Sequence, residues 1–453
     1  MAGCKYPFGD EISRGKTKAI HQGPRTNTVV LRNFSDITAN DDPSVTQQLG
    51  VKAVAATTTT CRIFELLRDA GIPVAYIERV TDTAFEAYNC KMVPIEAVAR
   101  RYAVGSYLKR HPEMGRETTP PFRFPWLVTE LFLKTTNGRC VLGDGNDHDF
   151  GLDPSKGQED PLMIWDDEKN NRWLLRHSKL PAWEAEADLG SVDDNLVSFD
   201  DEKLTSLLRR VFWVLEGAWS TLGWRLIDIK IEVGIVDGKM VVTDVIDNDS
   251  WRLRDTEWQE MSKQVFRDQI ARDGVDLDDL SWRYQLVADL TGQLRIPEQA
   301  IVLWLGSFSD YNKVREELEN VKKTIAMPAG VLLHQVALSG HRQTNSVLKA
   351  ISAIESEYPN GAVIIACVGL SNGLGPIVSA HTHLPVVSVP LTPEDWMSSA
   401  RLPGRVPAST MLKLENAVHQ ALQILGQKNP AAYAVVRELA EADTGLDADC
   451  ILL

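Results

Sequence analysis

Three groups of residues in this sequence carry side chains suited to phosphate chemistry. The first is Gly15-Lys16-Thr17-Lys18, in which two lysines stand beside a glycine. Lysine ammonium groups hold phosphates by charge, and glycine lets the backbone approach a ligand closely. The run lacks the spacing of a Walker loop, and a solvated surface hairpin is the alternative interpretation.

A second group contains Arg100, Arg101, Gly105 and Ser106, so that two arginines precede a Gly-Ser turn. The guanidinium fork binds planar oxyanions through two hydrogen bonds, and this set therefore suits a phosphate monoester. The alternative is an ordinary basic helix face.

A third group lies in the run Asp228-Ile229-Lys230-Ile231-Glu232, in which charged and branched apolar residues alternate. Alternation places the three charged side chains on one face of a strand. A paired strand brings Asp244 opposite, and the acidic run 247–249 follows it. Glu232 with Asp244 then forms an oxygen-ligand set for Mg²⁺, with Lys230 placed to neutralise phosphate charge. The alternative is the wet face of a strand.

The surrounding pattern predicts the elements that position these groups. Residues 15–31 read as a β-hairpin, and Asp237-Gly238 joins two further alternating strands. Apolar residues recur at helical spacing over 46–70, which stops at Gly71, and again over 201–222. Residues 135–200 are rich in Gly, Asp, Asn and Pro, and we expect a loop region with limited structure.

The pattern changes after Pro297, where we place a domain boundary. Beyond it, buried strands such as IVLWLGSFSD and AVIIACVG alternate with helical stretches. Strands that alternate with helices predict an α/β fold with a doubly wound parallel sheet, which binds ligands at the carboxyl ends of its strands.

Length and composition limit the class of protein. A chain of 453 residues predicts two or three domains, and its net charge of −14 argues against non-specific binding to nucleic acid or anionic membranes. No apolar run reaches the roughly 18 to 20 residues that span a bilayer, and we see no secretory signal at the N-terminus. The six cysteines are far apart, which favours a reducing, cytoplasmic setting.

Taken together, the runs GKTK, MVPIEAVARRYAVGSYLKR, DIKIEVG and DVIDNDSWRL resemble phosphoribosylaminoimidazole-succinocarboxamide (SAICAR) synthetase. In the second half, GSFSD, SGHR and LSNGLGP resemble phosphoribosylaminoimidazole (AIR) carboxylase. The order is similar to that of the animal-type bifunctional family. The resemblance implies an α+β ATP-dependent ligase domain over 1–260 with an insertion at 135–200, a helical linker over 261–297, and a carboxylase-like domain over 298–453.

The resemblance also implies ATP and Mg²⁺ as cofactors and assigns residue roles. It places ATP against Gly15, Lys16 and Lys18, with the adenine edge at Lys91, Met92, Val93 and Pro94. It assigns Mg²⁺ to Glu232 and Asp244, and catalysis to those two residues with Lys134 and Lys230. It assigns substrate binding in the ligase domain to Arg100, Ser106, Asp160, Asp249, Arg252 and Lys263. In the second domain it assigns ribonucleotide binding to Ser307, Asp310 and Ser339, and general acid or base catalysis to His341.

The implied reaction follows from elementary chemistry. A carboxylate is a poor acyl donor, because its leaving group would be oxide. Phosphorylation by ATP makes an acyl phosphate that an amine displaces, and this needs positioning and charge neutralisation more than a covalent protein group. In the family the amine is that of aspartate, the carboxylate belongs to an imidazole ribonucleotide, and the pathway is purine biosynthesis.

The sequence departs from the family in both halves. In the first, SDITANDD has Asn40-Asp41 where Gly-Asn is usual, threonines replace Ser-Asn in VKAVAATTTTCRIF, and Arg254 replaces a tryptophan. In the second, SGHRQTN replaces the family's SAHKGPD, and Leu370 replaces an arginine. We expect the second domain to have lost carboxylase activity and to persist as an oligomerisation core, octameric by resemblance.

Three classes of function remain open. They are the SAICAR synthetase itself, a diverged amide ligase joining another carboxylate and amine in specialised metabolism, and a non-catalytic scaffold. The last four residues, Cys450-Ile451-Leu452-Leu453, also have the form of a prenylation signal, although the preceding stretch is acidic rather than basic.

Overall fold

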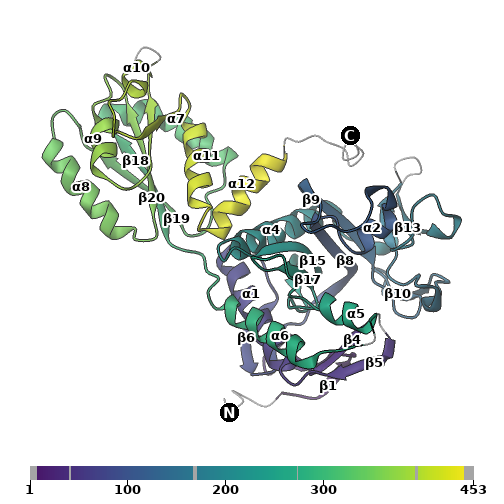
Figure 1. The fold of residues 1–453 in the computed structure, drawn as a ribbon. Helices are drawn as coiled ribbons and strands as arrows, with labels where there is room; N and C mark the ends of the chain where they lie inside the picture. Colours follow the sequence, from purple (N-terminus) through teal and green to yellow (C-terminus); the bar gives the residue numbers. More distant parts are fainter. Residues whose placement is uncertain (1–7, 40–41, 167–170, 273, 393–395, 443–453) are drawn as a thin grey trace. The chain divides into compact units, whose positions relative to one another are not determined.

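The computed structural model describes residues 8–39, 42–166, 171–272, 274–392 and 396–442 (Figure 1). The chain divides into two compact units, which meet in sequence between Leu294 and Arg295. The boundary predicted at Pro297 lies close to this division. None of the helices in the described ranges is long and apolar enough to cross a membrane. The Asn40-Asp41 departure and the Cys450 signal lie outside the described residues.

The first unit contains a smaller antiparallel sheet with the strand order β1-β2-β3-β7-β6. Helix α1 packs against β3, β6 and β7 and also contacts the short β4–β5 pair. These elements are β1 (Glu11–Arg14), β2 (Lys18–Gln22), β3 (Thr28–Asn33), β4 (Asp36–Ala39), β5 (Asp42–Gln48), α1 (Lys52–Asp69), β6 (Tyr76–Thr81) and β7 (Ala84–Tyr88).

A larger antiparallel sheet has the order β14-β13-β12-β9-β8-β15-β16, with β17 also paired to β15. Helix α4 packs against β8, β9 and β15. The strands of this larger sheet are β8 (Lys91–Tyr102), β9 (Arg123–Leu133), β12 (Leu162–Trp165), β13 (Arg172–Arg176), β14 (Asp188–Asp193), β15 (Arg225–Val236), β16 (Lys239–Thr243) and β17 (Trp251–Arg254). The other elements here are α2 (Ser106–Arg110), β10 (Arg139–Val141), β11 (Asp147–Asp149), α3 (Asp194–Val197) and α4 (Asp201–Ser220).

The two helices predicted in the first half are confirmed. Helix α4 begins after Asp200, whose side chain accepts a hydrogen bond from the backbone N–H of Lys203 and so caps the helix. Its apolar residues are buried, as the spacing predicts. Helix α1 ends before Gly71, as predicted, but it starts at Lys52, because residues 46–48 pair in strand β5 instead.

Both predicted hairpins are also confirmed. Strands β2 and β3 pair antiparallel within residues 15–31. The turn between β15 and β16 consists of Asp237 and Gly238, both with positive φ, at 49° and 74°. Two consecutive left-handed residues are what a tight hairpin of this kind requires.

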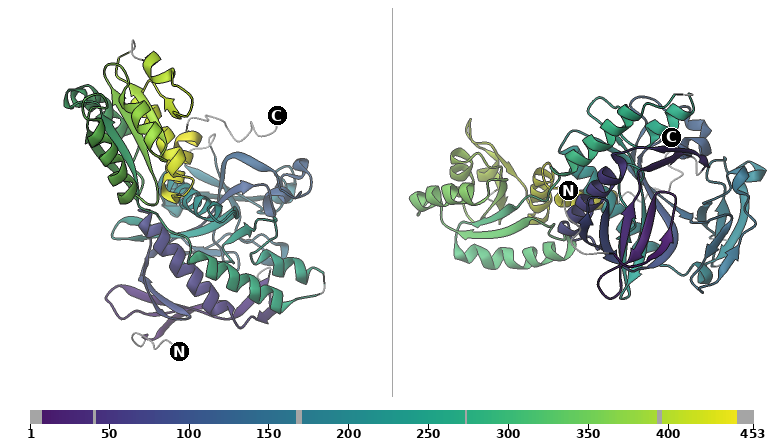
Figure 2. Two further views of the ribbon diagram at one scale, coloured as in Figure 1. Left: turned by 60° about the vertical axis from the view of Figure 1, so that its left-hand side comes forward. Right: turned by 90° about the horizontal axis from the view of Figure 1, so that it is seen from below.

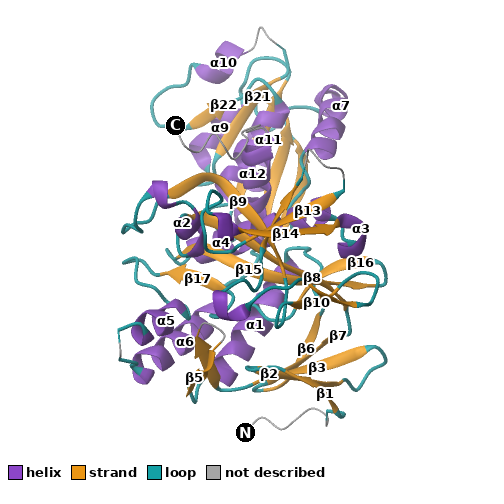
Figure 3. Cartoon of the chain, turned by 90° about the vertical axis from the view of Figure 1, so that its right-hand side faces the viewer, coloured by secondary structure: helices purple, strands orange, loops and turns teal. Residues whose placement is uncertain are grey.

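The expectation of limited structure over residues 135–200 is wrong. This stretch contains β10 to β14 and α3, and its last three strands extend the larger sheet from the edge of β9. Figure 3 shows β13, β14 and α3 close to one another. Glycine and aspartate turns separate strands of only three to six residues, too short to give a clear alternating pattern.

Residues 261–297, predicted as a helical linker, contain α5 (Gln264–Ile270) and α6 (Leu277–Thr291). Leu280 and Tyr284 of α6 share a buried cluster with Phe266 of α5 and with Ala55 of α1. The buried apolar face of these helices explains why they belong to the first compact unit rather than forming an extended connection.

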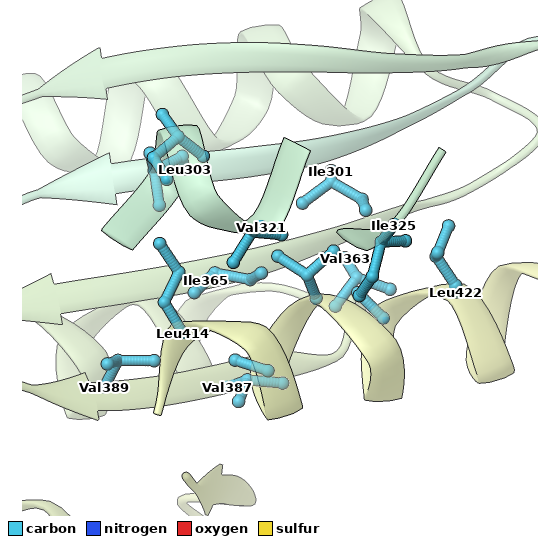
Figure 4. Close-up of a cluster of buried hydrophobic side chains, with 14 of the residues drawn as sticks. Ile301, Leu303, Val321, Ile325, Val363, Ile365, Val387, Val389, Leu414 and Leu422 are labelled. Atoms are coloured by element: carbon cyan, nitrogen blue, oxygen red, sulfur yellow. The ribbon is translucent and has the colours of Figure 1, made fainter. Parts of the chain in front are cut away.

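The second unit is the predicted doubly wound domain. Its five strands are parallel, in the order β19-β18-β20-β21-β22, and helices lie on both faces of the sheet (Figure 2). Alternate residues of β18 and β20 point into two separate apolar clusters, one of which is drawn in Figure 4. The elements are β18 (Gln299–Leu305), α7 (Phe308–Thr324), β19 (Val331–Ala337), α8 (Thr344–Glu357), β20 (Ala362–Val368), α9 (Leu374–His381), β21 (Val386–Pro390), α10 (Trp396–Ala400), β22 (Ala408–Thr410), α11 (Leu414–Leu425) and α12 (Pro430–Ala442).

Candidate functional site

The predicted catalytic residues meet on one face of the larger sheet, where β15 lies between β8 and β16. Glu232 of β15 pairs in register with Glu96 of β8 on one side and with Thr243 of β16 on the other. Asp244 directly follows Thr243 and has a positive φ of 63°. The register therefore brings three carboxylates to neighbouring strands.

Lysines compensate the charge of these carboxylates. Lys134 Nζ lies 2.5 Å from Glu232 Oε1, and Lys230 Nζ lies 2.5 Å from Glu96 Oε1 and 3.6 Å from Glu232 Oε1. Burial opposes the charge on Lys230, but Glu96 and Glu232 outweigh that effect and raise its pKa. Two lysines thus share Glu232, which is only 5% exposed.

Lys18 forms an ion pair with Asp244, so the first candidate group joins the same cluster. Burial favours the neutral form of Asp244, but Lys18, Lys134 and Lys230 hold the pKa of this carboxyl below its ordinary value. Gly15 and Lys16 lie in the turn between β1 and β2, where the Gly15 backbone N–H donates to the carbonyl of Lys18. The GKTK run is therefore more than a solvated hairpin, because Lys18 reaches the acidic residues.

Asp160 lies at the edge of this cluster. Its carboxylate accepts a hydrogen bond from the backbone N–H of Thr135, and its own N–H donates to the Thr135 hydroxyl. Burial, together with the nearby charge of Glu96, raises the pKa of Asp160 to about 7. The exchange of hydrogen bonds fixes Asp160 beside Thr135, the residue that follows Lys134 in the chain.

The donor set fits Mg²⁺. Carboxylate oxygens are the ligands that this ion prefers, and it commonly takes one or two of them together with substrate phosphates. Glu232 and Asp244 supply that set, and each already compensates a cation in the form of a lysine ammonium. Among the described residues, no group of three or more His, Cys, Asp or Glu side chains forms a metal site by itself.

The predicted phosphate clamp forms a second row across the same sheet. Asp228 of β15 pairs in register with Arg100 of β8 and with Arg252 of β17. Its Oδ2 accepts from Arg100 Nη1 and from Arg252 Nη1, each at 2.5 Å. We call the residues around Glu232 and Asp244 the catalytic row. Asp228 and Glu232 are four residues apart on one face of β15, so the clamp and the catalytic row are about 13 Å apart.

The two arginines of this clamp differ in how far their side chains are exposed to solvent. Arg100 is 4% exposed and is held by Glu130 at 2.6 Å, by Asp228, and by the hydroxyl of Ser106 at 3.2 Å. Arg252 keeps 18% of its side chain exposed. Arg252 therefore has the more accessible guanidinium, and Arg100 positions the acidic partner that both share.

Gly105 is required at the entrance to this clamp. Its φ of 58° lies in the left-handed region, which favours glycine. A Cβ at this position would lie 2.4 Å from Nη2 of Arg252. The Gly-Ser turn thus leaves room for the guanidinium, as well as supplying the Ser106 hydroxyl.

Asp249 and Lys263, both predicted to bind substrate, contact one another at 3.1 Å. Asp249 also lies 3.2 Å from Nζ of the buried Lys52 and accepts a hydrogen bond from the hydroxyl of Tyr284 at 2.6 Å. Although burial opposes ionisation, the two lysines hold the pKa of Asp249 well below its usual range. This cluster ties α1, α5 and α6 to the loop that follows β16.

Two of the altered threonines of α1 make buried hydrogen bonds, one of them to the same loop. The Thr60 hydroxyl donates to the backbone carbonyl of Ile246, and the Thr57 hydroxyl accepts from the side-chain amide of Asn33. Both threonines are fully buried. Thr60 therefore supports the loop after β16, whereas Thr57 joins α1 to β3.

The predicted adenine edge borders a cavity of about 60 Å³. Five of its lining residues come from β8 and β15, namely Lys91, Met92, Val93, Pro94 and Ile235. The other four come from the stretch predicted as an insertion, namely Leu142, Gly143, Val197 and Ser198. The cavity therefore opens beside the strand that carries the catalytic row.

In the second unit, the predicted residues gather at the carboxyl ends of β18, β19 and β20. The Ser307 hydroxyl donates to Asp310 at 2.7 Å, and the hydroxyl of Ser339 accepts from a backbone N–H at 3.3 Å. His341 packs so closely on Gly373 that a Cβ there would lie 2.2 Å from its Nε2. Leu370, which stands where the family has an arginine, is 79% exposed.

Sequence reasoning missed several charged residues of the first site. Glu96 and Glu130 are the acidic partners of Lys230 and Arg100, and Lys52 is a partner of Asp249. Each stands in an otherwise apolar or helical run, and a charged residue at a buried position is the signal that could have revealed it. Their partners, however, depend on strand order and register.

Known proteins match both units. The SAICAR synthetase family model matches residues 11–139 and 192–279, and the AIR carboxylase family model matches residues 300–444. The multifunctional protein ADE2 of Gallus gallus is 31% identical over 462 residues, which cover 96% of this chain and 94% of that protein.

Two further proteins are similar to this chain over most or part of its length. The bifunctional phosphoribosylaminoimidazole carboxylase/phosphoribosylaminoimidazole succinocarboxamide synthetase of Drosophila melanogaster is 31% identical over 446 residues, covering 95% of this chain and 92% of that protein. A solved structure of a SAICAR synthetase in complex with ADP is 19% identical, with a TM-score of 0.43, covering 63% of this chain and 99% of that one.

The first unit is thus an ATP-dependent ligase domain of the SAICAR synthetase type, followed by an AIR-carboxylase-like α/β domain. The whole chain belongs to the family of bifunctional AIR carboxylase/SAICAR synthetase proteins.

Proposed function

We propose that this protein joins the carboxylate of an imidazole ribonucleotide to the amino group of aspartate, using ATP and Mg²⁺ and releasing ADP and phosphate. This is the SAICAR synthetase reaction of purine biosynthesis. The observation that carries the proposal is the cluster of Lys18, Lys134 and Lys230 around Glu232 and Asp244. Strand β15, which carries Lys230 and Glu232, also borders the cavity at the predicted adenine edge. A non-catalytic scaffold would have no need to keep this set of charges around two carboxylates that are largely removed from solvent.

Each part of the first site has a task in such a reaction. Glu232 and Asp244 would hold the magnesium ion, which supplies charge neutralisation for the phosphates of ATP when it is bound. Lys18, Lys134 and Lys230 add positive charge where the phosphoryl group transfers. Their proximity to the carboxylates keeps all three positioned before substrate arrives.

The amine that attacks the acyl phosphate must lose a proton. Asp160 is suited to accept it, because its raised pKa, about 7, places it near neutrality, where a general base works best. Its two hydrogen bonds with Thr135 hold it in place at the edge of the charged cluster, where Glu96 and Lys230 act on it.

A diverged ligase is the second candidate function. It is favoured by the substituted threonines of α1, of which Thr60 supports the loop after β16 and Thr57 accepts a hydrogen bond from Asn33 of β3. Changes beside the organic substrates, with the phosphate and metal residues kept, are a route to new specificity. The phosphate clamp of Arg252 favours the phosphorylated substrate and therefore the first candidate.

A product assay separates the two candidates. Purified protein with carboxyaminoimidazole ribonucleotide, aspartate and Mg-ATP is expected to form the succinocarboxamide product with one ADP released per amide. Mass spectrometry of the product and a coupled ADP assay measure both. Nucleotide binding without any succinocarboxamide would rule out the first candidate and leave the diverged ligase.

For the second unit, we propose an assembly role without carboxylase activity, in a homo-oligomer. The exposed Leu370 lacks the guanidinium that would pair with a ribonucleotide anion. The full chain is therefore expected not to decarboxylate carboxyaminoimidazole ribonucleotide when ATP is left out. Loss of the ribonucleotide's carboxyl group in that assay, above the uncatalysed rate, would contradict this proposal.

A further inference from the structure

The candidate base cavity is built from two parts of the first unit. One side belongs to the sheet, where Val93 lies at a register shift between the pairs Met92–Gly234 and Glu96–Glu232. The other side is shared by Leu142 and Gly143 of an arm, residues 136–159, that leaves the sheet after β9, and by Val197 and Ser198 at the end of α3. The SAICAR synthetase match omits the stretch between residues 139 and 192, so most of this arm lies outside the matched family pattern.

The arm is fixed at its base beside the catalytic row. Thr135 and Asp160 exchange two hydrogen bonds of 2.8 and 3.0 Å, and the Leu133 N–H donates to the carbonyl of Pro161 at 3.0 Å. Strands β10 and β11 then pair within the arm. Its base therefore lies at Lys134, the lysine that contacts Glu232.

The tip of the arm lies against the turn that follows α3. The Gly143 N–H donates to the carbonyl of Leu196 at 2.7 Å, and the Leu142 N–H closes the hairpin tip on Asn146 at 3.1 Å. A Cβ on Gly143 would lie 2.7 Å from the Cβ of Ser198 and 3.0 Å from the Leu196 carbonyl oxygen. Only glycine at position 143 allows the two segments to approach this closely.

The contact of Gly143 with residues 196–198 sets the position of the cavity wall opposite the sheet. Leu142 and Val197 are 3% and 1% exposed, and together with Gly143 and Ser198 they face the sheet side of the cavity. Most lining side chains are apolar, which suits the flat faces of a purine ring, and Lys91 and Ser198 are the polar exceptions.

We propose that the arm 136–159, most of which lies outside the SAICAR synthetase match, is a nucleotide-binding element that closes the purine-base pocket through the Gly143–Ser198 contact. This rests on the proposed function, since the occupant is the base of the ATP that the ligase domain uses. The arm spans both ends of that ligand's site. It leaves the sheet next to Lys134, at the phosphate end, and its tip supplies part of the wall around the purine ring.

Calorimetric titration of the full chain with ADP and Mg²⁺ tests the proposal. Gly143→Ala pushes residues 196–198 away from the arm, and we expect it to weaken ADP binding by about tenfold. Gly50→Ala is the matched control, because no atom lies within 4 Å of a Cβ there, and ADP affinity should stay at the wild-type value.

A second change distinguishes the contact from a general folding defect. Ser198 has a φ of 51°, so Ser198→Gly suits the backbone and removes the atom that the new Cβ meets first. The double variant Gly143→Ala/Ser198→Gly is expected to recover ADP affinity to within about threefold of wild type, the signature of two coupled positions.

The outcomes separate the inference from the proposed function. Wild-type affinity in Gly143→Ala, or weak binding that persists in the double variant, would overturn the role of the arm and leave the ligase assignment intact. A wild-type chain that binds no ADP would overturn both.

Discussion

Replacement of Glu232 by glutamine is expected to lower the rate of amide formation by about a thousandfold or more, the loss seen when a preorganised charge is removed from a site of phosphate or acyl transfer. The carboxylate is 5% exposed and lies beside Lys134 and Lys230. Glutamine keeps the shape of the side chain but removes the negative charge, so the proposed magnesium site would lose one of its two carboxylates. ADP release in a coupled assay with saturating substrates measures the effect.

Folding must be separated from chemistry in this experiment, because the change leaves two lysines less compensated. Thermal unfolding of Glu232→Gln and of the exposed surface control Glu184→Gln should both be recorded. The control should match wild type in activity and in stability. If Glu232→Gln folds normally and keeps more than about a tenth of wild-type turnover, the metal assignment is wrong.

The alternating run of β15 separates what the sequence predicts, the strand face, from what it does not predict, the partners on neighbouring strands. Alternation alone predicts that Asp228, Lys230 and Glu232 share a strand face, and they do lie along one row of β15. It does not predict that Glu96 lies opposite Glu232, or that Asp228 lies between Arg100 and Arg252. Register depends on all the strands packing together, which no local pattern contains.

The long-range ion pairs are the clearest case of this limit. Lys134 and Glu232 are 98 positions apart, and Lys18 and Asp244 are 226 apart. Resemblance assigned these residues to one site. The Lys134–Glu232 pair becomes visible only once β9, β8 and β15 are placed side by side, and the Lys18–Asp244 pair only once β2 of the smaller sheet lies against the end of β16. The burial of Arg100 against Glu130 likewise emerges only from the strand order.

The arm was missed for a different reason. Its strands are three residues long and are separated by glycine and aspartate turns, so composition favoured a loop. Gly143 has an ordinary backbone conformation, because its φ is not positive. Its importance comes from what it touches, and a sequence pattern does not contain that information.

Replacement of Arg252 by lysine is expected to raise the KM for the phosphorylated carboxylate substrate by about a hundredfold, with a much smaller change in kcat. A lysine lacks the planar fork that binds an oxyanion through two parallel hydrogen bonds, and a lost charge-assisted bond costs about 2 to 3 kcal/mol. Arg252 has the more exposed of the two clamp guanidinium groups, and Asp228 holds it in place at 2.5 Å. The KM for ATP should not change, because the catalytic row lies about 13 Å away along β15.

Arg254 offers the matched control, because it lies two residues further along the same strand and contacts Glu117 and Glu260 instead of Asp228. Arg254→Lys should keep the wild-type KM for the phosphorylated substrate. The dephosphorylated riboside provides the decisive comparison. Wild type should prefer the phosphorylated form strongly, whereas Arg252→Lys should lose most of that preference, since the lost contact is with the phosphate itself. Equal discrimination by wild type and Arg252→Lys would mean that the carboxylate substrate has no phosphate at this clamp, and the diverged ligase would then be the better account of the site.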